Sequence, residues 1–397
     1  MPMGPEVMRQ RIRSSRICCI AGSRNTCVRQ AIFLVLLALL LSRSLVAQVA
    51  ATIKLRSEAA QAQADGKDDL AASLYSQTLT QDPTWTEGWW KYGGLLYEAK
   101  KFQPASIAFG HLTQLAPQNS LGFAMLGMCE YEMGDWSNAS LHLNKALVHG
   151  GLPPAIANGA MYEYALVLMR QKNRNGALIA LRLLQHAAPD TPNLVAAFGS
   201  AELGMEQIPA PSTADAEAVS LDGQAAIAVL QLKPQDAERL YRQAIQERPQ
   251  LPFAHLCLAL FLENLGRHAE AEDELKAEAA VNHVSPDAYL WLARFALARR
   301  ESEQTRNYAA EAIKRAPDDG LPYLLMGKSY VLDQKWDKAL ENLQEAEALS
   351  PDSYEVHYAL VTVYGALHDD QAADSERKLF TQAYAVAHPQ QKEGQKE

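Results

Sequence analysis

The residue types able to carry out chemistry are spread along the chain without the spacing of a catalytic motif. There is no HExxH or HxxEH pair to hold a hydrolytic zinc ion, no GxSxG to present an activated serine, and no GxxxxGKS or GxxxxGKT loop to cradle a phosphate. His142 and His149 lie seven residues apart on one expected helix, an arrangement typical of a surface pair. The sequence therefore predicts a protein that is not an enzyme and uses no cofactor and no metal.

The cysteines do not indicate a metal site or a disulfide framework. Cys129 and Cys257 are the two that follow the N-terminal segment, and no CxxC pair is present. A disulfide requires Cα atoms within about 7 Å of each other. Residues so far apart in an elongated chain do not meet that condition, so we expect both thiols to be buried and unpaired.

Charge limits the class of partner. The formal net charge of −9 divides into +6 for residues 1–47, which hold seven Arg and one Glu, and −15 for the rest of the chain. Non-specific binding of nucleic acid needs a positive surface. The acidic body therefore predicts a protein that does not bind nucleic acid.

The N-terminal 47 residues have the pattern of a signal peptide or membrane anchor. Arg24 and Arg29 precede the apolar run Ala31–Leu41, which small residues follow. The run is shorter than the roughly 20 residues of a membrane-spanning helix, so cleavage after Ala47 or Ala50 is expected. The sequence predicts an exported protein, periplasmic or secreted. The alternative is an uncleaved leader that anchors the protein with its remaining residues outside the cytoplasm.

The rest of the chain repeats with a period of 34 residues. Windows of that length begin at residues 52, 86, 120, 158, 218, 252, 286, 320 and 354. Small residues recur at fixed places because a large side chain there would force two packed helices apart. The twentieth residue is Ala in eight of the nine windows: Ala71, Ala105, Ala139, Ala177, Ala237, Ala271, Thr305, Ala339 and Ala373.

The stretch Leu321–Pro351 shows the pattern of one window most fully. Its key residues are Gly327, Tyr330, Trp336, Ala339, Ala346 and Pro351. This pattern and the period resemble the tetratricopeptide repeat (TPR) family. The resemblance implies an all-α fold, a right-handed superhelical solenoid of about nine helix hairpins. It also implies a concave groove, built mostly by the first helix of each hairpin, that binds an extended peptide or a partner's helix.

Two irregularities interrupt the period. The segment GGLPP at residues 150–154 adds four residues, and Met205–Glu217 is rich in Pro, Ala and acidic residues, typical of a loop. The preceding Pro192–Gly204 has the pattern of a first helix. The sequence therefore predicts a leader (1–47), an N-terminal sub-array (52–204), an irregular linker (205–217), a C-terminal sub-array (218–387) and a polar tail (388–397).

The resemblance places groove-facing residues at the second, fifth, ninth and twelfth positions of each window. In the early windows these positions are apolar or aromatic, and the residues predicted to bind a partner are Trp90, Tyr97, Leu121, Met128, Tyr131, Tyr162 and Met169. Exposed apolar patches mark contact sites. The alternative is that these side chains pack on one another or on the 192–217 segment. Some family members bind a chaperone's C-terminal carboxylate through Lys, Asn and Arg at groove positions. These residue types are absent there in the second and third windows, and later windows offer only Arg294 and Lys328 without a matching Asn.

Together these features predict an exported TPR scaffold that binds a protein or peptide partner, whose identity the sequence does not give. The alternative is an assembly factor of an envelope complex, anchored in the inner membrane by Ala31–Leu41.

Overall fold

The computed structural model describes residues 48–187 and 191–388. Within these ranges the chain is helical apart from its connecting segments and contains no β-strand, so the predicted all-α fold is confirmed. The chain divides into two compact units, residues 1–153 and 154–397. The predicted leader lies wholly outside the described residues, as does all of the predicted tail beyond His388.

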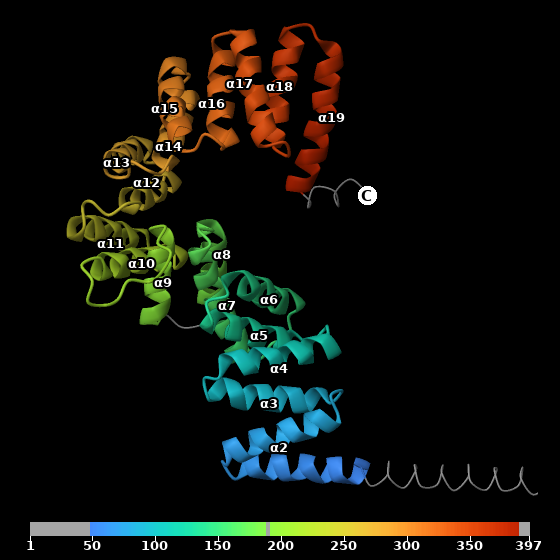
Figure 1. The fold of residues 1–397 in the computed structure, drawn as a ribbon. Coiled ribbons are helices and arrows are strands. Elements are labelled where there is room, and N and C mark those ends of the chain that lie inside the picture. The colour runs from blue at the N-terminus through green and yellow to red at the C-terminus, as the bar shows by residue number, and fades with distance from the viewer. Residues whose placement is uncertain (1–47, 188–190, 389–397) are drawn as a thin grey trace, which may run out of the picture. The chain divides into compact units, whose positions relative to one another are not determined.

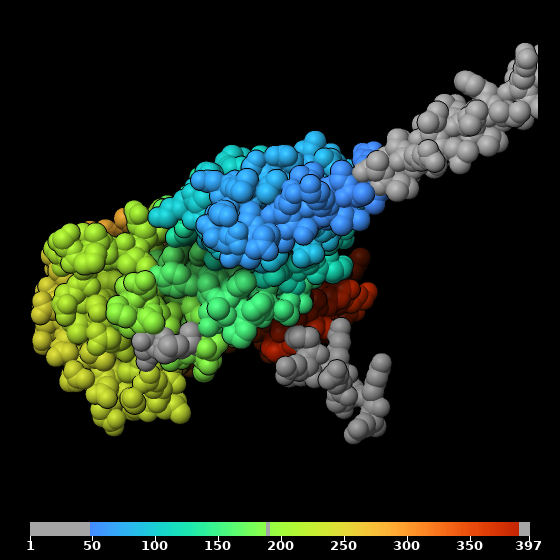
Figure 2. Space-filling model, turned by 90° about the horizontal axis from the view of Figure 1, so that it is seen from below, coloured from blue at the N-terminus to red at the C-terminus, as the bar shows by residue number. Residues whose placement is uncertain are grey.

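The first unit is a stack of three helix hairpins (Figure 1). The helices occupy residues 48–64, Asp68–Gln81 (α2), Thr86–Glu98 (α3), Phe102–Leu115 (α4), Ser120–Glu132 (α5) and Trp136–His149 (α6). In the space-filling view the blue and teal helices of this unit form one continuous packed surface (Figure 2).

The second unit contains six hairpins and one additional helix, α9. Its helices are Pro154–Arg170 (α7), Arg174–Ala187 (α8), Pro192–Glu202 (α9), Ala216–Leu230 (α10), Pro234–Glu247 (α11), Ala254–Asn264 (α12), His268–Val281 (α13), Asp287–Ala298 (α14), Ser302–Arg315 (α15), Gly320–Leu332 (α16), Trp336–Leu349 (α17), Tyr354–Ala366 (α18) and Asp370–Ala387 (α19). The nine hairpins of the described chain therefore follow the nine predicted windows, and α9 falls between the fourth and the fifth.

Small residues allow the two helices of each hairpin to approach closely. All nine residues at the twentieth position are buried, with exposed fractions of 0–4%. At the eighth position, a Cβ atom on Gly127 would lie 2.7 Å from the side chain of Leu143, and one on Gly327 would lie 2.7 Å from that of Leu343. The periodic Gly and Ala residues thus mark the helix–helix contacts, as the sequence predicts.

The turn inside each hairpin contains one residue in the left-handed region of backbone space. This residue always occupies the fifteenth position of its window: Gly66, Lys100, Gly134, Lys172, Leu232, Gly266, Arg300, Gln334 and His368, with φ between 57° and 76°. Its amide and the next one bond back to carbonyls of the preceding helix, which satisfies groups that the helix end would leave unpaired.

Both irregular segments depart from regular helix. Gly150 and Gly151 have positive φ, and the boundary between the two compact units falls just after them, between residues 153 and 154. The predicted linker 205–217 is made of turns and bends up to residue 215, and α10 begins at Ala216. The division into sub-arrays around that linker stays a prediction.

In the described part of the chain, no helix combines the length and apolar character needed to cross a lipid bilayer. The segment Ala31–Leu41, predicted as a signal peptide or anchor, lies outside the described residues.

The additional helix α9 is held against α10 by a contact between two glycines. A Cβ atom on Gly199 would lie 1.9 Å from the carbonyl oxygen of Val219, and one on Gly223 would lie 1.9 Å from that of Val195. The pairing of 199 with 219 and of 223 with 195 shows that the two helices run antiparallel. Backbone touches backbone here, so no side chain can move aside to make room.

We therefore predict that Gly199→Ala lowers the free energy of unfolding by about 3 kcal/mol or more, because α9 and α10 must separate to admit the methyl group. Urea unfolding followed by circular dichroism measures this change. Gly365→Ala in α18 is the matched control: its new Cβ meets no atom within 4 Å, so it should stabilise the protein by about 0.5–1 kcal/mol. Equal stability of Gly199→Ala and the wild type would contradict the close contact.

Candidate functional site

Five of the residues predicted to bind a partner lie in the first unit. Trp90 and Tyr97 are on α3, and Leu121, Met128 and Tyr131 are on α5; all five side chains are partly exposed. We call this set the aromatic strip.

The aromatic residues of the strip are held by ring contacts within their own hairpins. The ring centroid of Trp90 lies 5.7 Å from that of Phe109, and Tyr97 meets Phe102 edge-on at 5.5 Å. Tyr131 meets Trp136 edge-on at 5.6 Å. Each ring therefore has one face packed on the unit and another part open to solvent.

The other two predicted residues lie in the second unit, on α7. Tyr162 is partly exposed. Met169 is only 3% exposed and packs in a core cluster with Leu168 and Leu181, so it contributes to the interior of this unit. The alternative interpretation, core packing, therefore describes the position of Met169. The partner-binding role of the seven residues stays a prediction.

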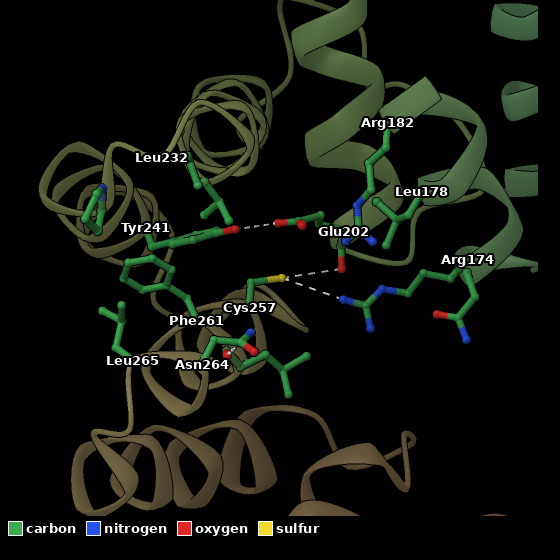
Figure 3. Close-up of a pocket in the computed structure, with 14 residues that line it drawn as sticks. Arg174, Leu178, Arg182, Glu202, Leu232, Tyr241, Cys257, Phe261, Asn264 and Leu265 are labelled. Carbon is green, nitrogen blue, oxygen red and sulfur yellow. Dashed lines mark hydrogen bonds between the residues drawn. The ribbon is translucent and has the colours of Figure 1, made fainter. Parts of the chain in front are cut away.

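The second unit also contains a cavity of about 560 Å³. It lies between α8, the end of α9, the α10–α11 turn, α11 and α12 (Figure 3). Its polar residues include Arg174, Arg182, Glu202, Tyr241 and Cys257. Its apolar walls include Leu178, Leu232, Leu260, Phe261 and Leu265.

Helical periodicity brings these side chains to one side of each helix. Arg174, Leu178 and Arg182 follow one another at intervals of four on α8 and so share a face. Cys257 and Phe261 share a face of α12 for the same reason. Tyr241 approaches Glu202 from one side of the cavity, while Arg174 and Arg182 approach from the other (Figure 3).

Two acidic side chains lie together at the base of this site. Glu202 accepts a hydrogen bond of 2.9 Å from the Tyr241 hydroxyl. Asp222 is 0% exposed, and neither of its carboxyl oxygens receives a hydrogen bond from the described residues. Glu202, Asp222 and Cys257 each place a side-chain oxygen or sulfur within 4.8 Å of the others. If Asp222 were ionised as well as Glu202, neither a hydrogen-bond donor nor solvent would stabilise its charge.

Asp222 therefore keeps its proton in the folded protein. Burial, and next the charge of Glu202, raise the pKa of Asp222 well above its usual range, although Arg174 opposes the shift. Burial also raises the pKa of Glu202, which the hydrogen bond from Tyr241 and the charges of Arg174 and Arg182 counteract. The pair then holds one proton and one negative charge.

The thiol of Cys257 is poorly suited to bind a metal or attack a substrate. Its Sγ lies 3.5 Å from the backbone oxygen of Glu202 and 3.7 Å from Nη2 of Arg174. Burial, followed by the nearby acids, raises the pKa of the thiol well above its usual range, so it stays protonated. The adjacent guanidinium also repels cations. Cys129 and Cys257 are both buried, and Cys257 is a free thiol, as predicted.

Glu347, His357 and Glu376 in the C-terminal hairpins form a second cluster of possible metal ligands. The contacts of His357 give this cluster a structural explanation. His357 is buried; its Nε2 lies 2.8 Å from the carbonyl oxygen of Pro351 and its Nδ1 2.8 Å from a carboxylate oxygen of Glu376. Both ring nitrogens are therefore engaged by protein oxygens. The ring links α18 to the preceding turn and to α19.

Sequence reasoning did not predict the cavity. Arg174 and Arg182 are on a second helix, outside the positions taken as groove-facing, and Glu202 lies in the interval that no window covers. One signal was present: at the fifteenth position of the windows every residue is Gly or polar except Leu232.

Comparison with known proteins is consistent with the repeat architecture. A family profile described as a tetratricopeptide repeat matches residues 224–282, from within α10 to just past α13. No curated protein matches the chain. The profile match and the stacked hairpins together define a TPR-type helical repeat fold, a class that generally forms protein-interaction scaffolds.

Several solved structures are similar to the chain at low identity. MamA from Desulfovibrio magneticus RS-1 is 18% identical over 44% of this chain and 97% of its own, with a TM-score of 0.37. Yeast Tom70 is 13% identical over 84% of this chain and 76% of its own, also with a TM-score of 0.37. A tetratricopeptide repeat protein from Parabacteroides merdae is 14% identical over 70% of this chain and 98% of its own, with a TM-score of 0.34. At these TM-scores the similarities say nothing about function.

The buried carboxyl pair predicts a pH dependence of stability. The folded protein retains a proton on Asp222 that the unfolded chain loses above about pH 3.8. Stability from this group is therefore present at acid pH and falls as pH rises toward the folded-state pKa, by at most about 1.4 kcal/mol per pH unit. Asp222→Asn has nearly the same shape as the wild-type side chain and does not titrate.

We expect Asp222→Asn to show a smaller loss of stability than the wild type between about pH 4 and pH 8. Urea unfolding at a series of pH values measures how the free energy of unfolding of each protein changes with pH. Glu202 shifts in the same direction, so a residual slope should remain. Parallel pH profiles for the two proteins would show that Asp222 is already ionised in the folded state.

Proposed function

We propose that this protein is an exported scaffold that binds an apolar or aromatic-containing segment of another protein along the aromatic strip. The observation that carries the proposal is the partial exposure of large side chains on two successive first helices, α3 and α5. Tyr, Trp and Met are enriched at protein interfaces, and the first two dominate their energetics. An exposed row of such residues supports a contact surface.

The ring contacts favour binding because they fix the aromatic side chains in advance. Trp90 is restrained by Phe109, and Tyr131 by Trp136. A side chain that is already restrained loses little entropy when a partner covers it. Truncating a central aromatic residue of an interface typically weakens binding by about 2 kcal/mol or more.

Export is supported by the leader, whose basic residues precede Ala31–Leu41. The second candidate function, an assembly factor anchored in the inner membrane, uses the same strip but retains the leader. N-terminal sequencing of the protein from the envelope fraction separates the two. A mature terminus near residue 48 or 51 favours the cleaved scaffold, and a terminus upstream of residue 31 favours the anchored form.

Substitutions on the strip should abolish partner capture. We expect Trp90→Ala combined with Tyr131→Ala to lose the proteins that the wild type retains in affinity purification from the envelope fraction, as read by mass spectrometry. The Ala changes also remove ring contacts, so Met128→Lys serves as a second variant that adds a charge to the strip. Ile107→Lys on α4, where Ile107 is 55% exposed, is the control.

The readout is repeated by calorimetry with each purified partner, and thermal melting confirms that every variant is folded. Folded strip variants that bind the same partners with unchanged affinity would exclude the strip as the binding surface.

A further inference from the structure

We propose that the cavity between α8 and α10–α12 binds a small amphipathic monocarboxylate, an apolar chain or ring system bearing one carboxylate. Arg174 and Arg182 would receive the carboxylate, while Leu232 and Phe261 would contact the apolar part. This site lies in the second unit and is separate from the aromatic strip.

The charge of the cavity favours an anion. Among residues 48–187 and 191–388, no carboxylate oxygen lies within 4.0 Å of either guanidinium, and the Nε of Arg174 is buried without an acceptor. Among the described residues, Glu202 is the only acid that lines the cavity, and the neighbouring Asp222 keeps its proton. Two positive charges therefore face one negative charge, and the excess is a single positive charge.

That excess matches a monoanion better than a more highly charged ligand. A carboxylate would bring the charge of the site to neutrality and can accept two parallel hydrogen bonds from one guanidinium. A phosphate with two charges would leave one negative charge unbalanced beside Glu202. A cationic ligand would add to the excess that is already present.

The rim of the cavity carries apolar groups that folding alone does not explain. Leu232 is 88% exposed, and Leu265 and Val229, which also line the cavity, are 45% and 37% exposed. Leu232 also has φ of 58°, a conformation that costs a non-glycine residue about 1 kcal/mol or more. The corresponding residue in the other eight hairpin turns is Gly, Lys, Arg, Gln or His.

A strained, exposed Leu therefore stands where all the other turns have Gly or a polar residue, at the mouth of an apolar cavity. Contact with a ligand would bury this side chain and give it the stabilising role that it lacks in the free protein. The volume of about 560 Å³ is within the range of sites that bind small molecules.

The test uses the full chain and three probes of equal chain length: octanoate, octanol and octylamine. Isothermal titration calorimetry should show binding of octanoate, with octanol and octylamine roughly tenfold weaker or more, because a charge-assisted hydrogen bond contributes about 1.5–3 kcal/mol. Arg182→Gln should weaken octanoate binding by a similar factor. Its side chain is exposed, so the melting temperature should not fall.

Leu232→Gly separates ligand contact from folding. Glycine relieves the strain at positive φ, so this variant should melt at the same or a higher temperature while binding octanoate more weakly. His368→Gly makes the same exchange in the α18–α19 turn, where φ is 60°. This control variant should stabilise the protein without changing its affinity for octanoate.

Four results would overturn the proposal: no binding of octanoate, equal binding of octanol or octylamine, unchanged affinity in Arg182→Gln, or unchanged affinity in Leu232→Gly. A peptide that ends in leucine provides one more arm. If it binds where octanoate does not, and loses binding when its C-terminus is amidated, the cavity takes a chain terminus and the assignment to a small ligand is wrong. Met128→Lys on the aromatic strip should leave octanoate binding intact, so this proposal and the proposed function can fail independently.

Discussion

The whole structure depends on close approach between helix backbones at positions where side chains are small. The small residue at the twentieth position of each window is fully or almost fully buried, and where Gly occupies the eighth position it accepts a large side chain from the facing helix. A single hairpin cannot bury its apolar faces by itself, so stability comes from contacts between neighbours. The 34-residue period in the sequence reflects this one helix–helix contact, which recurs in each hairpin.

The additional helix α9 shows what happens where the period is broken. It packs on α10 through the Gly199–Gly223 contact, and its last residue, Glu202, reaches the face of α12 that bears Cys257. The acidic pair and the cavity next to it arise from this insertion and do not recur in the regular hairpins of the described chain. A regular stack supplies a scaffold, and its one irregular helix supplies a site with its own chemistry.

Much of the fold could be predicted because it rests on local spacing. The helix pairs, the buried residues at the twentieth position and the turns after each first helix all follow from one 34-residue pattern. Thr305, which replaces Ala at that position, is equally buried and bonds its hydroxyl to the backbone oxygen of Glu301. The pattern tolerates this change because Thr is still small and its hydroxyl has a local acceptor.

The site could not be predicted to the same degree because it depends on contacts between distant residues. Arg174, Glu202, Asp222 and Cys257 come from four helices and from the interval where the windows lose phase. Met169 shows the limit of a position rule, since a residue assigned to the groove by its phase packs in the core of the unit. Only Leu232 carried a signal in the sequence itself, as an apolar residue at a turn position that otherwise holds Gly or a polar side chain.

The central claim is that α9 is an integral, closely packed part of the second unit and so fixes the cavity. Amide hydrogen exchange, resolved by helix, tests this most directly. The close contact predicts that residues 192–202 and 216–230 exchange as slowly as α12 and α13, because all four open only when the unit unfolds. Exchange of α9 as fast as that of the 203–215 connection would contradict the account, because α9 would then open independently of α10.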